Sequence, residues 1–173
     1  MFTRKTPARS LRLALLAPLI LVVSASGSAA VAPWRWPIAP PHPVEAGFVA
    51  PLTPYAAGHR GIDMPADANA AVFAPSPGVV SFAGDVADRP LLSIAHAGDL
   101  ISSVEPVDAL VAVGDRVAAG QQVGTVASGG HCAARCLHFG VREHGLYVSP
   151  LRFLGGMPRA VLLPNQARGW ARR

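Results

Sequence analysis

Two histidines and one aspartate are the first candidates for chemistry in this chain. His59 and Asp63 lie four residues apart in a stretch flanked by glycines, and His138 follows 75 residues after Asp63. Two imidazoles and one carboxylate are a common ligand set for a catalytic zinc ion, which keeps a fourth position open for water. The spacing of His59 and Asp63 alone would equally suit a hydrogen bond within a loop. The surrounding elements must decide between these two interpretations.

The apolar residues around them occur in short runs that predict strands. The runs are rich in Val, Ile and Leu and are bounded by Gly, Pro, Asp and Asn, as turns bound the strands of an antiparallel sheet. No 12-residue stretch beyond the amino-terminal region shows a convincing helical period. We therefore predict an all-β fold, mostly antiparallel, with a sandwich or barrel-like architecture. The main runs are 71–73, 79–82, 91–96, 100–104, 122–126 and 137–141.

The last of these runs gives His138 a defined position. Successive side chains of a strand point to opposite faces, so Leu137, Phe139 and Val141 share one apolar face. His138 and Arg142 then lie on the other, less apolar face. This alternation makes His138 available to a groove and favours the metal-ligand interpretation.

The amino-terminal residues have the order of a secretory signal. Four basic residues precede the apolar run 13–23, and small residues follow it. The run has 11 residues and contains Pro18, whereas a membrane-spanning helix needs about 20 residues. We therefore expect a secreted, extracytoplasmic protein with no membrane association after cleavage. The expected divisions are a signal peptide at 1–30, a proline-rich lead-in at 31–44, one folded domain at 45–155 and a tail at 156–173.

The charge of the chain argues against nucleic acid as a partner. The net charge is +5, but four of the fifteen basic residues belong to the signal, which leaves eleven arginines against ten acids. Phosphate binding needs clustered Lys or Arg. The arginines crowd only at the end of the tail, as Arg168, Arg172 and Arg173. We expect no nucleic-acid partner.

Seven segments follow, in order, the pattern of a known family. They are 59–65, 72–75, 78–84, 93–96, 113–121, 136–142 and 150–151. Together they resemble the lysostaphin-type (LytM-like) zinc metallopeptidases of peptidoglycan. The resemblance implies one zinc ion bound by His59, Asp63 and His138 below a β-sheet groove. It also implies hydrolysis of peptide bonds in the peptides of bacterial peptidoglycan, and we expect a monomer that works at the cell wall.

The chain departs from that family at two positions. The last motif of the family normally carries a histidine two residues before the zinc ligand, where this chain has Cys136. A middle strand normally supplies a further histidine, where this chain has Pro106. Two residues could substitute for these assisting histidines. They are His131, which lies five residues before Cys136, and Glu105, whose carboxylate could act as a general base.

Each substitute also has an ordinary interpretation. His131 follows two glycines and would suit a surface turn, and Glu105 would suit an exposed charge on a strand. Our hypothesis is that hydrolysis is slow or lost, or that it depends on one of these two residues.

The only two cysteines, Cys132 and Cys136, are expected to form a disulfide, because the chain is exported to an oxidising place. Such a small loop would stabilise the fold by on the order of 2 kcal/mol, so its main effect would be to hold His131 beside the groove. The alternative is that Cys136 binds zinc as a thiolate, which a disulfide would exclude.

Two other classes of function are alternatives to the enzyme. Residues 111–121 also resemble the barrel of biotinyl and lipoyl carriers, but those carriers need a lysine for their cofactor. The only lysine in the chain, Lys5, belongs to the expected signal peptide, so the carrier function is excluded. The stronger alternative is a catalytically impaired member of the same fold that binds cell wall or regulates another hydrolase. The missing histidines favour that alternative and the three retained ligands oppose it. The principal prediction is a secreted zinc metalloendopeptidase.

Overall fold

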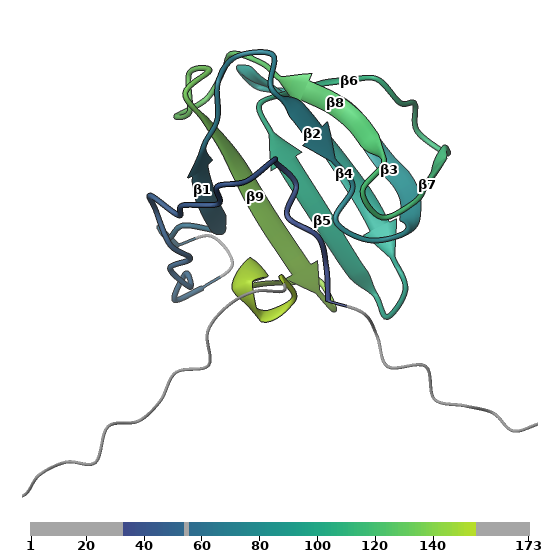
Figure 1. Ribbon diagram of the computed structural model, residues 1–173. Coiled ribbons are helices and arrows are strands. Elements are labelled where there is room, and N and C mark those ends of the chain that lie inside the picture. The colour runs from purple at the N-terminus through teal and green to yellow at the C-terminus, as the bar shows by residue number, and fades with distance from the viewer. Residues whose placement is uncertain (1–32, 54–55, 155–173) are drawn as a thin grey trace, which may run out of the picture. The chain divides into compact units, whose positions relative to one another are not determined.

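A computed structural model of the chain describes residues 33–53 and 56–154 (Figure 1). The predicted signal peptide and the predicted tail lie outside the described residues. Within them, no helix is long enough and apolar enough to cross a membrane.

The described residues form β-strands joined by turns and loops, followed by one short 3-10 helix (Figure 1). The strands are β1 (Gly61–Pro65), β2 (Ala71–Phe73), β3 (Gly78–Val86), β4 (Arg89–His96), β5 (Leu100–Glu105), β6 (Val107–Ala109), β7 (Arg116–Val117), β8 (Gln122–Val126), β9 (Cys136–Glu143) and β10 (Leu146–Val148). The 3-10 helix η1 (Pro150–Arg152) follows β10.

The strands pair into two antiparallel sheets. The larger sheet has the order β1-β9-β5-β4-β3-β7, and β10 pairs with the end of β9 that β1 leaves free. The smaller sheet has the order β2-β8-β6. Every strand pair in both sheets is antiparallel, which confirms the predicted all-β, mostly antiparallel fold.

Turns that use left-handed backbone connect the neighbouring strands of the larger sheet. Gly98 and Asp99 have φ angles of 78° and 56° between β4 and β5. His144 and Gly145 have φ angles of 50° and 78° between β9 and β10, which suits a two-residue hairpin turn. His144 therefore lies at a hairpin tip.

Buried side chains from both sheets form one core cluster. In β9, Leu137, Phe139 and Val141 are fully buried, as the alternation predicted. Burying each such side chain stabilises the fold by about 1.5–3 kcal/mol. Because these residues anchor one face of β9, they hold the opposite face, with His138, in a constant orientation.

The proline-rich lead-in packs onto the same core. Trp34 and Ile38 are buried, and the Trp34 backbone N–H donates to the Phe153 carbonyl at 2.9 Å. Trp34 also forms an isolated parallel bridge with Leu154. The folded unit therefore includes residues before position 45, where we expected it to begin.

Candidate metal centre

The pairing of β1 with β9 brings two of the predicted ligands together. Asp63 and His138 are direct partners across the antiparallel pair, so their side chains emerge side by side on the same face. His59 precedes β1 and is fixed by a two-way backbone bridge with Val49, with both N···O distances at 2.9 Å. His138 thus meets His59 and Asp63, which precede it by 79 and 75 residues, beside the β1–β9 pair.

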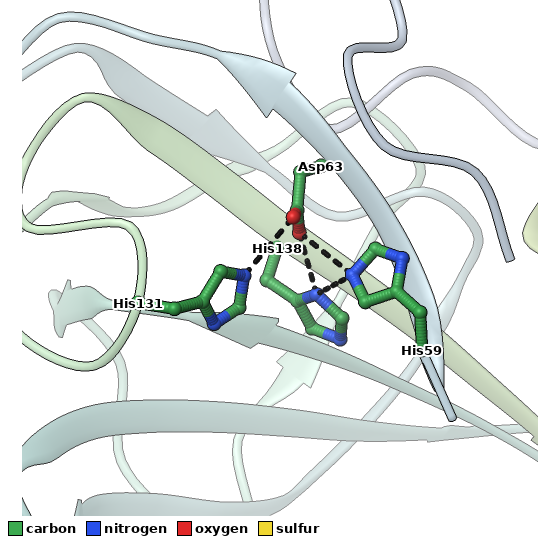
Figure 2. Close-up of side chains that lie close together, drawn as sticks. All are labelled: His59, Asp63, His131 and His138. Atoms are coloured by element: carbon green, nitrogen blue, oxygen red, sulfur yellow. Dashed lines mark hydrogen bonds and ion pairs between the residues drawn. The ribbon is translucent and has the colours of Figure 1, made fainter. Parts of the chain in front are cut away.

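The ligand atoms of these three residues converge closely (Figure 2). His59 Nε2 lies 3.1 Å from Asp63 Oδ1 and 3.1 Å from His138 Nδ1, and His138 Nδ1 lies 2.7 Å from Asp63 Oδ1. Ligands at 2.0–2.2 Å from a tetrahedral zinc ion would lie roughly 3.4 Å apart. The three atoms therefore need only a small expansion to hold one ion.

A backbone carbonyl fixes the orientation and tautomer of His59. The His59 ring places Nδ1 2.7 Å from the Gly47 carbonyl oxygen, which can only accept a hydrogen bond. Nδ1 must therefore carry a proton, and in the neutral ring Nε2 presents a lone pair towards Asp63 and His138. Metal-bound histidines commonly have their second nitrogen held in this way. His59 thus presents an unprotonated nitrogen and Asp63 a carboxylate oxygen to a cation at this centre.

The environment keeps Asp63 and His138 in the protonation states that a metal requires. Burial, the largest influence, acts to raise the pKa of Asp63, but hydrogen bonds from His138 and His131 and the nearby imidazole charges lower it below its ordinary value. Burial lowers the pKa of His138, against the opposing effects of Asp63 and Glu105. An ionised carboxylate and a neutral imidazole are the forms that bind zinc.

A third imidazole, His131, reaches the same centre from the loop before β9 (Figure 2). His131 Nε2 lies 3.0 Å from Asp63 Oδ2, the carboxylate oxygen that does not contact His59 or His138. The ligand atoms of His59, Asp63, His131 and His138 all lie within 4.8 Å of one another. The His131 side chain is 52% exposed, whereas that of His138 is 12% exposed. His131 thus stands at the open side of the centre.

The loop that carries His131 is closed by a disulfide between Cys132 and Cys136. Cys136 is the first residue of β9 and pairs with Pro65 of β1, so the covalent bond ties the loop to the sheet. The backbone N–H of Ala133 donates to the Gly129 carbonyl at 3.1 Å within the same loop. With its sulfur in this bond, Cys136 has no thiolate to offer a metal.

The structure brings Glu105 close to the centre but gives it a different partner. Glu105 is opposite His138 in the β5–β9 pair and is buried. Its Oε1 lies 2.8 Å from Arg89 Nε, in an ion pair rather than a well-aligned hydrogen bond. The expected exposed charge is therefore a buried one that Arg89 neutralises. Sequence reasoning did not single out Arg89, because only the register of β4, β5 and β9 places it there.

A groove of about 360 Å³ runs from the centre along the sheet. His131 and His138 line it beside the centre, and Ser93 and Ser103 line its floor. The Oγ atoms of these serines lie 2.8 Å apart across β4 and β5.

Comparison with known proteins identifies the family. The model of peptidase family M23 matches residues 57–150, a segment that contains the whole centre. The chain belongs to peptidase family M23. This family, to which the LytM-type domains belong, is one of zinc-dependent peptidases, so the resemblance seen in the sequence is confirmed.

Curated relatives of this M23 domain are longer proteins. An uncharacterized protein of Mycobacterium tuberculosis is 40% identical over 129 residues, which cover 71% of this chain and 52% of the relative. The murein hydrolase activator NlpD of Escherichia coli is 33% identical over 130 residues, which cover 73% of this chain and 32% of NlpD. The chain thus spans about half or less of the length of the curated relatives it matches.

Solved structures of other proteins have the same fold. The catalytic domain of the prophage-encoded M23 protein EnpA from Enterococcus faecalis, in a mutant form, is 27% identical with a TM-score of 0.56, and the match covers 68% of this chain and 95% of EnpA's. A zinc-containing peptidase from Vibrio cholerae matches with a TM-score of 0.60 at 22% identity, over 69% of this chain and 40% of that protein. The SpoIIQ–SpoIIIAH pore-forming complex also matches, with a TM-score of 0.60 at 20% identity, over 70% of this chain and 90% of the matched chain.

Proposed function

We propose that this M23 domain is an extracytoplasmic zinc metalloendopeptidase that cleaves peptide bonds in bacterial peptidoglycan. His59 Nε2, Asp63 Oδ1 and His138 Nδ1 would hold one zinc ion. The observation that carries the proposal is the convergence of these three atoms within 3.1 Å of one another, with the His59 tautomer held by the Gly47 carbonyl. Three protein ligands leave one position open towards the groove, as a catalytic site requires.

When bound, the ion would polarise an amide carbonyl and make water a nucleophile near neutral pH. The protein itself must then accept and deliver a proton. The positions at which the family normally has assisting histidines are Cys136, whose sulfur is in the disulfide, and Pro106, whose ring has no proton to exchange.

We assign proton transfer to His131 rather than to Glu105. His131 is half exposed to the groove and holds Asp63 Oδ2 at 3.0 Å, so its ring sits beside the reacting position. Glu105 is engaged with Arg89 at 2.8 Å, and using it as a base would break a buried ion pair. A positioned histidine typically contributes a factor of about 10²–10⁴ to the rate.

A second candidate function is regulation of another cell-wall hydrolase. It is favoured by the absence of a histidine at positions 136 and 106 and by the similarity to NlpD, a murein hydrolase activator. In that case zinc would hold the groove in shape, and peptide binding rather than cleavage would be the activity.

The deciding experiment measures zinc content and release of soluble fragments from dye-labelled peptidoglycan by the purified protein. We expect one zinc per chain and measurable release, and we expect His138→Ala to lose both. His131→Ala should keep its zinc but lose roughly 10²–10⁴ in rate. His144→Ala, an exposed histidine at the β9–β10 turn, is the matched control.

The outcomes separate the candidates. Zinc without release by the unaltered protein would reject the peptidase, and stimulation of a purified cell-wall hydrolase would then support the regulator. Full release by His131→Ala would reject the assignment of proton transfer to His131.

A further inference from the structure

The groove carries more positive than negative side chains beyond the metal centre. Arg60, Arg89 and Arg142 line it, and Glu105 is the one acid that lines it among the described residues. Glu105 is already paired with Arg89, which also lies 3.4 Å from Asp88. The carboxylate of Glu105 is therefore already engaged by Arg89 and is not the partner of Arg142.

Arg142 is the groove arginine without an acidic partner. Within the part of the chain that the structure describes, no carboxylate lies in ion-pair range of its guanidinium, and its Nε is buried without a hydrogen-bond partner. By contrast, Arg152 lies 3.0 Å from Glu143. A guanidinium has five N–H donors, and leaving a buried donor unpaired is costly. The buried Nε itself is out of reach of a ligand, but Arg142 lines the groove and no described residue accepts a hydrogen bond from its two Nη groups. These Nη donors are the ones that a ligand could use.

An aromatic ring holds Arg142 in place. Tyr147 of β10 is the direct partner of Arg142 in the β9–β10 pair, and the guanidinium lies 5.5 Å from the centre of its ring. Arg60 lies 5.7 Å from the same ring and donates from Nη2 to the Ala56 carbonyl at 3.1 Å. Cations within about 6 Å of a ring centre are attracted to its face. Tyr147 therefore gathers two positive charges at one end of the groove.

The distance between this end and the metal centre is set by β9. His138 and Arg142 point to the same face, four residues apart, so their Cα atoms are separated by roughly 14 Å at 3.4 Å per residue. Between them, Gly140, Ser103 and Ser93 form one row across β9, β5 and β4. This row has no charged side chain, and its two hydroxyl groups can hydrogen-bond to a peptide backbone.

We infer that Arg142, oriented by Tyr147, is a carboxylate-binding subsite that selects anionic peptides. The bound carboxylate would lie about four residues of extended peptide from the amide at the metal centre, because each residue spans about 3.3 Å. This rests on the proposed function only in that the metal centre marks the position of the reacting amide. A planar guanidinium matches a carboxylate with two parallel hydrogen bonds.

The experiment compares two fluorescently labelled peptides in binding by anisotropy. One is a synthetic peptidoglycan stem pentapeptide with free carboxylates, and the other is the same peptide with its carboxylates converted to amides. The protein is used as the full mature chain after zinc removal, so that no turnover intervenes. We expect the unaltered protein to prefer the free carboxylates by about tenfold, as one charge-assisted pair predicts.

Single substitutions test which residue produces the preference for free carboxylates. Arg142→Gln should lose it, Arg142→Lys should keep only part of it, and Arg152→Gln should behave as the unaltered protein, because Arg152 lies outside the groove lining. Tyr147→Ala provides a second route, since it removes the ring and leaves the charge. Unchanged preference in both Arg142→Gln and Tyr147→Ala would overturn the inference, as would equal binding of both peptides by the unaltered protein.

Two further arms distinguish related results. Displacement by inorganic phosphate but not by acetate at equal ionic strength would show a phosphate site instead and would overturn the assignment of a carboxylate. Zinc content and peptidoglycan release are measured on each preparation before zinc is removed. If the unaltered protein binds no zinc or releases no fragments at that stage, yet its zinc-free form still discriminates between the peptides, the peptidase is rejected and this subsite is kept.

Discussion

At the scale of single residues, the metal centre needs a residue without a side chain at position 61. Gly61 is paired with Gly140 in the β1–β9 ladder, next to the ring of His138. A Cβ atom at Gly61 would lie 2.6 Å from His138 Nε2 and closer still to the Phe139 carbonyl. The absence of a side chain at position 61 is therefore what leaves room for the imidazole.

Gly61→Ala should accordingly displace His138. We expect zinc affinity to fall at least tenfold and the free energy of unfolding to fall by about 1–3 kcal/mol, as overpacking usually costs. Competition with a chromogenic chelator measures the first and denaturant unfolding the second. Gly84→Ala is the control, because its added Cβ would meet Phe82 only at 3.6 Å. Normal zinc affinity in Gly61→Ala would contradict the proposed role of His138 as a ligand.

At the scale of elements, a covalent bond ties the loop before β9 to the larger sheet. The disulfide between Cys132 and Cys136 joins the loop to the sheet, and His131 adjoins it. The His131 ring donates a hydrogen bond to the Asp63 side chain at 3.0 Å. The position of His131 should therefore depend on the disulfide more than the fold does.

Replacing both cysteines by serine tests this dependence. We expect the free energy of unfolding to fall by about 2 kcal/mol, the contribution of a short closed loop. Zinc content should persist, because His59, Asp63 and His138 are positioned by β1, β9 and the Val49 bridge. Peptidoglycan release should fall towards the level of His131→Ala. Release equal to that of the unaltered protein would show that the loop needs no covalent support.

The same elements show what the sequence could and could not predict. Alternation in β9 correctly separated the core residues from His138, because side-chain direction in a strand follows directly from position. The sequence predicted a place for His131 near the metal centre only as one of two alternatives, because the conformation of a loop does not follow from a repeating pattern of residues. The partner of Glu105 was not predictable, because strand register is set by tertiary packing and Arg89 comes from another strand.

At the scale of the whole molecule, His96 joins the lead-in to the larger sheet. Its ring centre lies 4.6 Å from that of Trp34, Nδ1 lies 2.9 Å from the Pro77 carbonyl, and Nε2 lies 2.8 Å from Ser102 Oγ. Burial lowers the pKa of His96, and the Pro77 hydrogen bond offsets this only in part. The folded protein therefore holds this imidazole neutral where an unfolded chain would protonate it.

This difference predicts a pH dependence of stability. Above the unfolded pKa of about 6.5 both states are neutral at His96 and the residue has no effect. As the pH falls through that value, the unfolded state binds the proton first, so the fold loses stability until the lower folded pKa is reached. Measured by denaturant unfolding between pH 7.5 and 5, the free energy of unfolding should therefore decrease less for His96→Gln than for the unaltered protein. For His144→Gln, at an exposed position, it should decrease as much as for the unaltered protein.

The bridge between Trp34 and Leu154 has a consequence for the order of the chain. Because the two ends of the folded unit are already hydrogen-bonded neighbours, a short linker could join them, and the chain could be opened at the exposed turn of residues 97–99 instead. His138 would then precede His59 in such a circular permutant. The metal centre should still assemble, because it depends on which strands are neighbours in the sheet and not on their order along the chain.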